Sequence, residues 1–306
     1  MLRQQLSESL RLPLTFLDKL ARTANHRYKR YEIEKRGGGT RTIFHPAREL
    51  KVTQRWLLDC VIAKWPVHES ATAYRAGHNI AHNARVHAKN RFLLRMDLEE
   101  FFPSLRSADV RGYLDEDPAR TTGWDAEDRS FFQLIVCRFG RLAIGAPSSP
   151  GLSNAMCWYL DVLFSDFCSA RRIAYTRYAD DLFFSSELPN QLGEVEEFVG
   201  REVPQLRLPS GLRINQAKTR HTSKKRRREV TGLVLTCDGK VSLGRGRKRQ
   251  IRALIHQVTS LDETQRSQLA GWLAYAKDIE PRLLNSLVLK YGHETVRRAL
   301  MNESTS

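Results

Sequence analysis

The stretch that most restricts the fold is Arg-Tyr-Ala-Asp-Asp-Leu-Phe-Phe-Ser-Ser at residues 177–186. Its adjacent acids, Asp180 and Asp181, stand between apolar runs at 173–175 and 182–184. Buried carboxylates are costly unless a cation or a hydrogen-bond donor compensates their charge. An Asp-Asp pair is usually a surface turn, but these flanks are too apolar for an exposed loop. We therefore expect two strands joined by a turn, with a cation beside the acids.

A third acid belongs to the same pattern. Phe92-Leu93-Leu94-Arg95-Met96-Asp97 has the composition of a buried strand that ends in a carboxylate. Neighbouring strands of one sheet can bring Asp97 beside Asp180 and Asp181. Oxygen ligands of this kind suit Mg²⁺, and two ions about 3.5–4 Å apart stabilise both oxygens of an in-line phosphoryl transfer. The three acids thus predict a catalytic site with two Mg²⁺ ions, for which Mn²⁺ is a possible substitute.

The charge of the chain predicts a polyanionic partner. Its formal net charge is +16 and its pI is about 9.9, and Lys and Arg release counterions when they bind phosphates. The excess is concentrated in two blocks, which comprise Lys218, Arg220, Lys224, Lys225, Arg226, Arg227 and Arg228, then Arg245, Arg247, Lys248, Arg249 and Arg252. A solvated face or a localisation signal is the alternative. Because the blocks flank a short apolar strand, we favour nucleic-acid binding.

Periodicity predicts an α/β (α+β) chain with a helical C-terminal part. A Gly-rich turn over 36–43 should join two strands, and Asp125 should begin a helix that Gly140 ends. The expected helices cover 50–64, 125–139, a stretch from about Pro150, 187–210 and the chain from 247, with a strand over 230–236.

The remaining composition favours a protein of the reducing cytoplasm. The five cysteines are scattered and include no Cys-x-x-Cys pair, which argues against disulfides and structural zinc. No membrane partner is expected, since no run of 18 apolar residues occurs, and the first residues lack the apolar core of a signal peptide. The spacing of His78 and His82 suits a helix, but we expect no metal there, because no further ligand such as Cys lies nearby.

Four motifs, in the correct order, resemble those of reverse transcriptases. They are Tyr178-Ala179-Asp180-Asp181; Arg95 to Ser104; Gly145 to Pro150 followed by Leu152-Ser153-Asn154; and Ile214 to Thr219. The resemblance covers about residues 30–240. It implies a right-hand polymerase with an antiparallel palm sheet. Residues 1–90 would form N-terminal helices and fingers, 91–237 the palm with part of the fingers around 105–150, and 238–306 a helical thumb.

Two shorter strings narrow the resemblance to bacterial retron reverse transcriptases. They are Asn83-Ala84-Arg85-Val86-His87 and Val230-Thr231-Gly232. The resemblance implies a bacterial cytoplasmic enzyme that copies a structured noncoding RNA from a 2′-OH of that RNA. The product would be branched RNA–DNA (msDNA), and a separate effector protein would act with the enzyme in antiphage defence. A group II intron-like or abortive-infection reverse transcriptase is the alternative enzyme, and a catalytically silent RNA-binding scaffold is the alternative of another class.

The resemblance also implies roles for individual residues. Metal ions would be held by Asp97, the Leu98 carbonyl, Asp180 and Asp181. The dNTP would be bound by Arg41, Phe102, Gly145, Pro147 and Lys218, with Phe102 excluding a ribose 2′-OH. RNA would be contacted by Asn83, His87, Lys224, Lys225, Arg226, Arg227, Arg228, Val230, Thr231, Gly232, Arg247 and Arg249. The chain departs from the family at Ile144, where Gln is usual, which leaves the fine specificity open.

Overall fold

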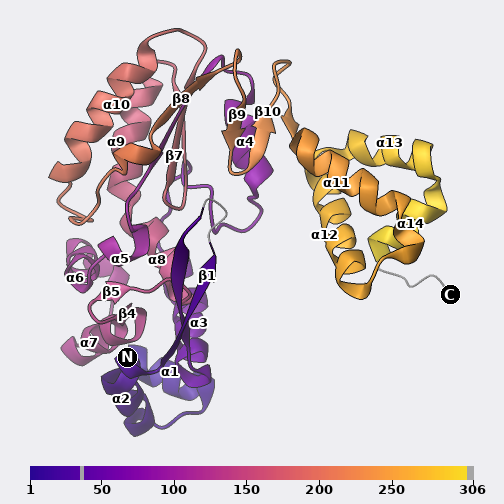
Figure 1. The fold of residues 1–306 in the computed structure, drawn as a ribbon. Helices are drawn as coiled ribbons and strands as arrows, with labels where there is room; N and C mark the ends of the chain where they lie inside the picture. The colour runs from indigo at the N-terminus through magenta and orange to yellow at the C-terminus, as the bar shows by residue number, and fades with distance from the viewer. Residues whose placement is uncertain (35–37, 302–306) are drawn as a thin grey trace. The chain divides into compact units, whose positions relative to one another are not determined.

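A computed structural model describes residues 1–34 and 38–301. The chain divides into two compact units (Figure 1). The first comprises Met1–Ala76, Arg95–Phe183 and Gly193–Arg220, and the second Gly77–Leu94, Phe184–Leu192 and the chain from His221 on. Helices and antiparallel strand pairs make up both, as the sequence predicts. No helix in the described residues is long and apolar enough to cross a bilayer.

The first unit begins with two helices and a hairpin. Helices α1 (Leu2–Leu10) and α2 (Leu14–Thr23) precede the antiparallel strands β1 (Tyr28–Glu34) and β2 (Thr40–Pro46). The predicted Gly-rich hairpin is thus confirmed, although Arg36 and Gly37 of its turn lie outside the described residues. Helix α3 (Arg48–Cys60) follows and buries Leu50 and Leu57, in agreement with the predicted helix.

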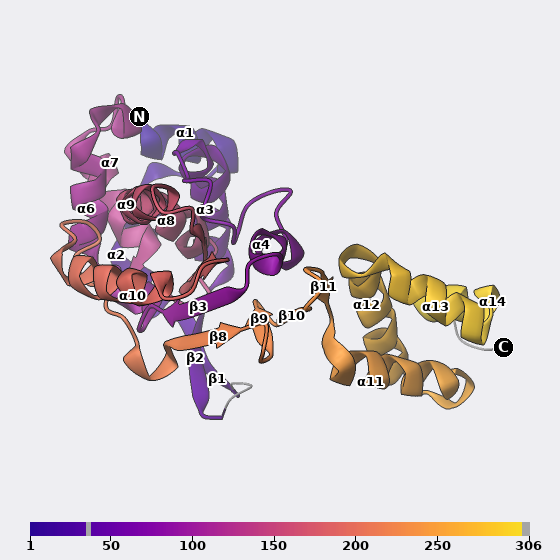
Figure 2. The same ribbon diagram turned by 90° about the horizontal axis from the view of Figure 1, so that it is seen from above.

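A four-stranded sheet carries the Asp-Asp segment. Its strand order is β6 (Ala174–Tyr178), β7 (Asp181–Ser186), β3 (Phe92–Asp97) and β8 (Arg220–Ser223). The apolar residues of β3 and β7 are almost completely buried, and α9 (Trp158–Ser169) and α10 (Gln191–Glu202) lie along the sheet (Figures 1 and 2). The predicted pair of strands around the two aspartates is confirmed.

Two predicted helices of the first unit differ from the structure. Asp125 caps α7 (Ala126–Val136) as expected, but the helix ends early. Strands β4 (Cys137–Arg138) and β5 (Arg141–Leu142) pair around a turn whose two residues have positive φ, a geometry typical of tight hairpins. The helix expected from Pro150 is two helices, α8 (Ser148–Met156) and α9, separated at Cys157.

The second unit joins a small sheet to a bundle of helices. Helix α4 (Ile80–Ala88) packs on the sheet of β9 (Arg228–Val230), β10 (Leu233–Leu235) and β11 (Val241–Ser242). The single strand predicted over 230–236 is therefore wrong. Thr231 and Gly232 both have positive φ, at 48° and 82°, so the backbone reverses there and forms a hairpin.

The C-terminal helices confirm the predicted helical end. They are α11 (Gly244–His256), α12 (Glu263–Ile279), α13 (Pro281–Tyr291) and α14 (His293–Met301), and they pack on one another (Figure 2). Their buried side chains include Ile251, Leu269, Leu273, Leu283, Leu287 and Val296.

Short helices complete both units. They are α5 (Phe101–Ser104), α6 (Ser107–Glu116) and the 3₁₀ turns Ala24–His26, Ile62–Lys64, Pro118–Thr121, Val203–Gln205, Gln216–Lys218 and Val258–Ser260.

Candidate active site

A polar cavity of about 480 Å³ in the first unit contains most of the predicted catalytic residues. Its walls come from β2, the loop before α4, the end of β3 with α5, and the turn between β6 and β7. Its lining residues are Thr40, Arg41, Thr42, Phe44, Tyr74, Asp97, Leu98, Glu99, Glu100, Phe101, Phe102, Pro103, Ile144, Asp180, Asn215 and Lys218. Residues far apart in the sequence thus share one concave surface.

Backbone hydrogen bonds hold Asp97 and Asp180 next to each other. The Leu98 N–H donates to the Asp180 carbonyl at 2.8 Å, and the Asn215 N–H donates to the Asp97 carbonyl at 2.8 Å. Ala179 has a φ of 57°, which is uncommon for a residue with a side chain. This left-handed residue turns the chain immediately before Asp180, so the aspartate lies at the tip of the hairpin.

The cavity concentrates negative charge that protein cations only partly neutralise. Asp97 is 3% exposed, and the Lys218 ammonium lies 2.8 and 3.0 Å from its two carboxylate oxygens. Burial, together with the nearby Asp97, raises the pKa of Asp180 against the opposing effect of Arg41 and Lys218. A raised carboxyl pKa means that the site disfavours a further negative charge, and a bound cation would relieve this.

Asp181 has a different environment from Asp180. It does not line the cavity, and its Oδ1 accepts hydrogen bonds from Arg95 Nε at 3.0 Å and Nη2 at 2.8 Å. Burial raises the pKa of Asp181 to about 6, although Arg95 lowers it. Asp180 lies in the turn whereas Asp181 is the first residue of β7, so the two neighbouring acids have different partners.

The donor set of the cavity fits a hard divalent cation. Asp97, Leu98 and Asp180 line the same space, with Glu99 and Glu100 also in the lining, and oxygen ligands with retained waters are what Mg²⁺ prefers. Within residues 1–34 and 38–301, no group of three His, Cys, Asp or Glu side chains is arranged to hold a metal ion. Of the three acids predicted to hold metal ions, Asp97 and Asp180 line the cavity and Asp181 does not.

The aromatic side chains Phe102 and Tyr74 line the cavity together with the acids. Phe101 is buried in the core, whereas Phe102 is only half-buried and borders the cavity. Tyr74 lies 6.5 Å from Phe102 between ring centroids and is 52% exposed. We did not predict Tyr74 from the sequence, because nothing distinguishes it from an ordinary loop aromatic. Its backbone φ is 59°, in the left-handed region that is uncommon for a residue with a side chain.

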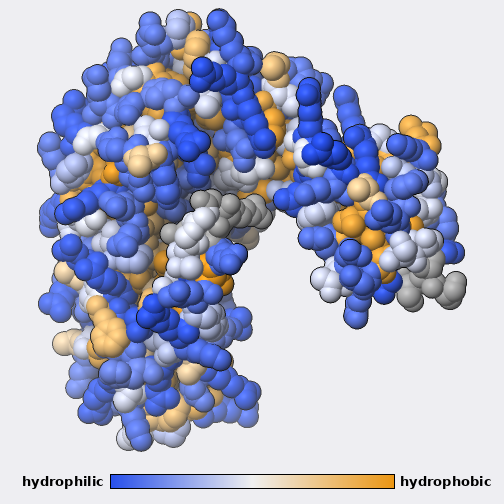
Figure 3. Space-filling view, viewed as in Figure 1, coloured by the Kyte–Doolittle hydropathy of each residue, from blue (hydrophilic) through white to orange (hydrophobic). Residues whose placement is uncertain are grey.

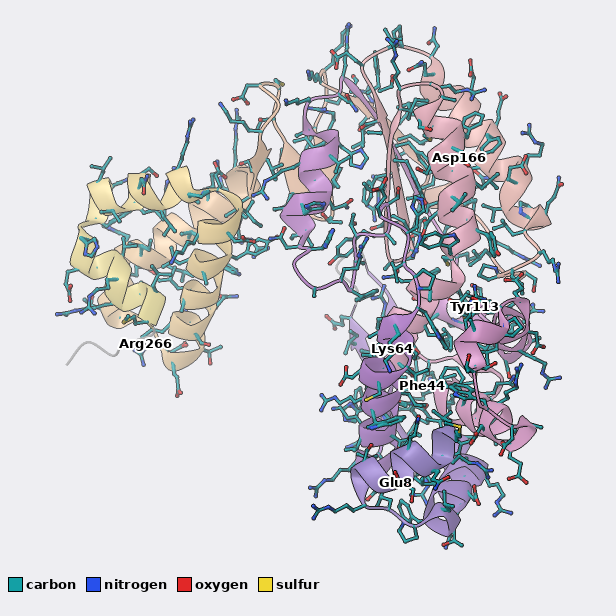
Figure 4. The ribbon with its side chains drawn as sticks, turned by 180° about the vertical axis from the view of Figure 1, so that it is seen from behind. Glu8, Phe44, Lys64, Tyr113, Asp166 and Arg266 are labelled. Atoms are coloured by element: carbon teal, nitrogen blue, oxygen red, sulfur yellow. The ribbon has the colours of Figure 1, made fainter. Side chains whose placement is uncertain are left out.

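The Gly145 turn packs against β2. Gly145 and Pro147 do not line the cavity, whereas Ile144 does. A Cβ on Gly145 would lie 2.8 Å from the Phe44 carbonyl oxygen, and the Phe44 N–H donates to the Ile144 carbonyl at 2.8 Å; Phe44 is labelled in Figure 4. The glycine therefore allows this turn to pack closely on β2, a role that differs from the predicted dNTP contact.

A fully buried ion pair lies beneath the catalytic turn. The Arg177 guanidinium contacts Asp161 of α9 through Nε at 2.8 Å and Nη2 at 2.6 Å, and both side chains are 0% exposed. Its Nη1 donates to Asn154 Oδ1 at 3.1 Å and to the Ala179 carbonyl at 3.3 Å. Arg177 thus links α8 and α9 to the left-handed residue before Asp180.

The same ion pair supports the loop that carries Tyr74. Asn154 Nδ2 donates to the Ala73 carbonyl at 2.8 Å, and the Arg177 carbonyl accepts the Thr72 N–H at 2.8 Å. Two walls of the cavity are therefore connected through one buried cluster. The sequence contained a weak signal for it, namely an arginine and an aspartate within apolar segments.

Four of the predicted RNA-binding side chains are inside the second unit. Asn83, His87 and Val230 are 0% exposed and Arg228 is 1% exposed. Arg228 donates to the carbonyls of Ala88 at 3.3 Å and Thr236 at 2.9 Å, and also to that of Asn90. These four predictions are corrected to structural roles, because the side chains satisfy backbone groups or fill the core and do not face solvent.

The buried His87 predicts a pH-dependent stability. Its Nδ1 lies 2.7 Å from Ser185 Oγ, and burial lowers its pKa to about 3. As pH falls below about 6.5, His87 binds a proton in the unfolded chain but stays neutral in the folded chain. The free energy of unfolding should therefore fall by about 1.4 kcal/mol per pH unit. The loss should continue until the pH approaches the folded-state value.

Urea unfolding between pH 7 and pH 4 would measure this effect. His87→Asn should show a shallower dependence of the unfolding free energy on pH than the parent chain. The matched control is His256→Asn, which changes an exposed histidine in α11. Parallel curves for the parent and His87→Asn would contradict the assignment.

The two basic blocks meet in one groove of the second unit. A cavity of about 610 Å³ is bordered by Lys224, Lys225, Arg226 and Arg227 from the first block and by Arg245 and Lys248 from the second. Arg247 instead stacks on Trp272 at 4.6 Å, and Arg249 is exposed outside the groove. Thr231 Oγ1 donates to the Ile80 carbonyl at 3.2 Å, and exposed Gly232 completes the hairpin turn.

Comparison with known proteins identifies the family. A family model described as reverse transcriptase (RNA-dependent DNA polymerase) matches residues 33–235. The retron Ec86 reverse transcriptase of Escherichia coli is 32% identical over 303 residues, which cover 96% of this chain and 92% of that protein. This chain belongs to the retron reverse transcriptases. The retron Ec83 reverse transcriptase of Escherichia coli is 34% identical, with 90% of each chain covered.

Solved structures agree with the right-hand polymerase fold of this retron reverse transcriptase. A structure of telomerase from Candida albicans with a fragment of telomeric RNA superimposes with a TM-score of 0.51 at 15% identity. The match covers 95% of this chain and 59% of that chain. The retron family membership makes this protein an RNA-directed DNA polymerase, so the proposed enzyme class is confirmed and the silent-scaffold alternative is disfavoured.

Proposed function

We propose that the cavity around Asp97 and Asp180 adds deoxynucleotides to a growing strand by two-metal-ion nucleotidyl transfer. The observation that supports this most directly is the presence of both carboxylates together with Arg41 and Lys218 in the lining of one cavity. Acids suit divalent cations, and the two basic side chains suit a triphosphate.

Different residues of the cavity have different roles in nucleotidyl transfer. Mg²⁺ held by Asp97, Asp180 and the Leu98 carbonyl would stabilise the attacking and leaving oxygens. Arg41 binds phosphate oxygens of the dNTP, and the Lys218 ammonium offers charge or a proton to the leaving pyrophosphate. In this scheme Asp181 maintains the hairpin through Arg95 and contributes charge without lining the cavity.

The retron relatives support a particular RNA partner. We infer that the template and primer are a structured noncoding RNA, that synthesis begins at a guanosine 2′-OH, and that the product is branched RNA–DNA (msDNA). The groove that combines the two basic blocks would hold RNA through its backbone and shape, with Arg247 and Arg249 at its edge. A separate effector protein, a role in antiphage defence and a bacterial cytoplasmic location complete this proposal.

The subdomains of a right-hand polymerase can be assigned along the chain. We propose fingers in residues 1–90, a palm in 91–237 that contains part of the fingers around 105–150, and a thumb in 238–306. The last assignment is supported by the packing of α11 to α14 into their own cluster.

The experiment that tests the RNA partner uses the native complex. The chain is purified from its own host, and the copurified nucleic acid is treated separately with RNase and DNase and then sequenced. A single RNA species joined to DNA through a 2′-linkage is expected. Random cellular RNA without a branch would contradict the retron mechanism and favour a group II intron-like or abortive-infection enzyme.

Phe102 is expected to select deoxynucleotides. Phe102→Val should open the wall beside Tyr74, because removal of the ring leaves space for a ribose 2′-OH. Discrimination against rNTPs should fall by about 10–200-fold, the range typical of one steric contact. Phe102→Tyr is the matched control, since it keeps the ring. Single-nucleotide incorporation with dNTP and rNTP measures the ratio, and an unchanged ratio in Phe102→Val would exclude this role.

A further inference from the structure

Helix α11, which carries the second basic block, begins without the local stabilisation that helices usually have. Its N-cap, Leu243, makes no side-chain hydrogen bond, and no acidic residue lies in its first turn. Glycines at two of its first three positions lower the helix propensity. Arg245, Arg247 and Lys248 add positive charge at the positive end of the helix dipole. Contacts from outside the helix are therefore needed to hold this end in place.

Glu280 supplies such contacts from the junction of α12 and α13. Its Oε2 accepts the Ser242 hydroxyl at 3.0 Å and the Leu243 N–H at 3.2 Å, and the same hydroxyl accepts the Gly244 N–H at 3.2 Å. Its Oε1 lies 2.6 Å from Lys248 Nζ. One distant carboxylate therefore takes the place of the side-chain cap and of the acidic first-turn residue that α11 lacks.

The backbone of Glu280 is fixed by the helices on either side of it. Its N–H donates to the Ala276 carbonyl of α12 at 2.9 Å, and its carbonyl accepts the Leu283 N–H of α13 at 2.8 Å. The side chains of Glu280 and Lys248 are only 21% and 23% exposed, so salt screens their ion pair less than it screens a surface pair. The carboxylate is thus a fixed point against which the start of α11 is placed.

The segment that Glu280 holds is part of the basic groove of the second unit. Gly244, Arg245 and Lys248 line this groove together with the first basic block at 224–227. Figure 3 shows strongly hydrophilic side chains gathered over the part of this unit where α11 begins. If this end of α11 frayed, its two groove cations would lose their fixed position relative to the first block.

We propose that Glu280 is a positioning residue for RNA binding, which holds the start of α11 so that both basic blocks contact RNA phosphates together. The inference rests on the proposed function, since it concerns the RNA groove assigned there. The charge of Glu280 and its positioning role have opposite effects on affinity. Charge alone predicts that removal of an acid beside a cationic groove strengthens RNA binding, whereas the positioning role predicts that its removal weakens RNA binding.

The test compares Glu280→Ala with Glu229→Ala in the full chain. Glu229 also pairs with a cation of the groove, Arg227, at 3.0 Å, but it belongs to β9. Both variants lose one negative charge beside the groove, so the change in charge is matched. Fluorescence anisotropy with a labelled RNA stem-loop over a salt series gives the dissociation constants and the salt slopes, and thermal unfolding checks that both variants fold.

Glu229→Ala should bind the stem-loop at least as tightly as the parent does. Glu280→Ala should bind it about tenfold more weakly, and its salt slope should fall by about 2, as expected when two cations no longer contact phosphates. Unchanged or tighter binding by Glu280→Ala would overturn the inference.

Glu280→Gln provides a conservative comparison that keeps an acceptor oxygen for Ser242 and Leu243. Its affinity should lie between those of Glu280→Ala and the parent. If Glu280→Ala does not fold, Glu280→Gln is compared with Glu229→Ala by the same criterion, and binding as tight as that of Glu229→Ala would contradict the positioning role.

Limited proteolysis gives a local measurement that does not depend on RNA. Trypsin cleaves after Lys and Arg, and the start of α11 offers Arg245, Arg247 and Lys248. Cleavage in this segment under native conditions should be about tenfold faster in Glu280→Ala than in Glu229→Ala, because loss of a cap favours local opening. Equal cleavage rates would show that other contacts hold α11, which would also overturn the inference.

RNA binding by the parent chain separates this inference from the proposed function. If the parent shows no salt-dependent binding of RNA, the proposed RNA groove fails and the positioning role fails with it. If the parent binds RNA but Glu280→Ala binds it as Glu229→Ala does, only the positioning role fails.

Discussion

Asp180→Asn is expected to reduce dNTP incorporation by about 10³-fold, equivalent to about 4 kcal/mol of transition-state stabilisation. The substitution keeps the shape of the side chain and removes the charge that borders the cavity. Asp97→Asn should have a similar effect, and Asp180→Asn combined with Asp181→Asn should abolish incorporation. RNA binding should be preserved, because the basic groove of the second unit is unchanged.

Comparison of neighbouring aspartates makes this prediction specific. Asp181→Asn should cause a smaller loss than Asp180→Asn, since Asp181 contacts Arg95 and does not line the cavity. Asp166→Asn, at an exposed position of α9 labelled in Figure 4, is the control. Single-turnover primer extension gives the rates. An Asp180→Asn rate equal to that of the control would refute the metal assignment.

Breaking the Arg177–Asp161 pair should have the largest effect on stability. Asp161→Asn or Arg177→Met leaves one fully buried polar group without its ionic partner. The free energy of unfolding should fall by about 3–5 kcal/mol, as is typical when one member of a buried pair is removed. The control is Arg201→Met, which breaks an exposed pair with Glu202 and should cost at most about 1 kcal/mol.

A double variant separates stability from positioning. Asp161→Leu with Arg177→Met replaces the pair by apolar side chains and should regain much of the lost stability. Incorporation should nevertheless stay low, because the Ala179 carbonyl has lost the Arg177 donor that supports the turn before Asp180. Denaturant unfolding and primer extension measure the two properties. Full recovery of both would show that Arg177 acts only through stability.

The elements that the sequence predicts well are those set by local chemistry. The Asp125 side chain accepts the Asp128 N–H and starts α7 as expected, and the apolar runs on either side of the two aspartates form the buried strands β6 and β7. Elements that depend on a reversal of the backbone were less predictable. An apolar run over 230–236 is consistent with one strand, and only the positive φ of Thr231 and Gly232 divides it into two.

Burial of charged side chains was the property least accessible to sequence reasoning. Arg228 belongs to a run of basic residues, yet it is inside the second unit and donates to three backbone carbonyls. Its neighbour Arg227 is exposed and lines the basic groove. The sequence contains no feature that distinguishes the two, because the difference arises from which carbonyls the folded chain leaves without donors.

The sequence by itself determined the family, the order of the motifs and the identity of the acids, because residue type and spacing along the chain carry that information. Only the tertiary structure decided that Asp180 faces the cavity while Asp181 contacts Arg95. It also decided that the Tyr74 ring lies beside the Phe102 ring and that Arg177 supports the turn before Asp180. Side-chain direction and burial depend on contacts between distant segments, and these exist only once the chain has folded.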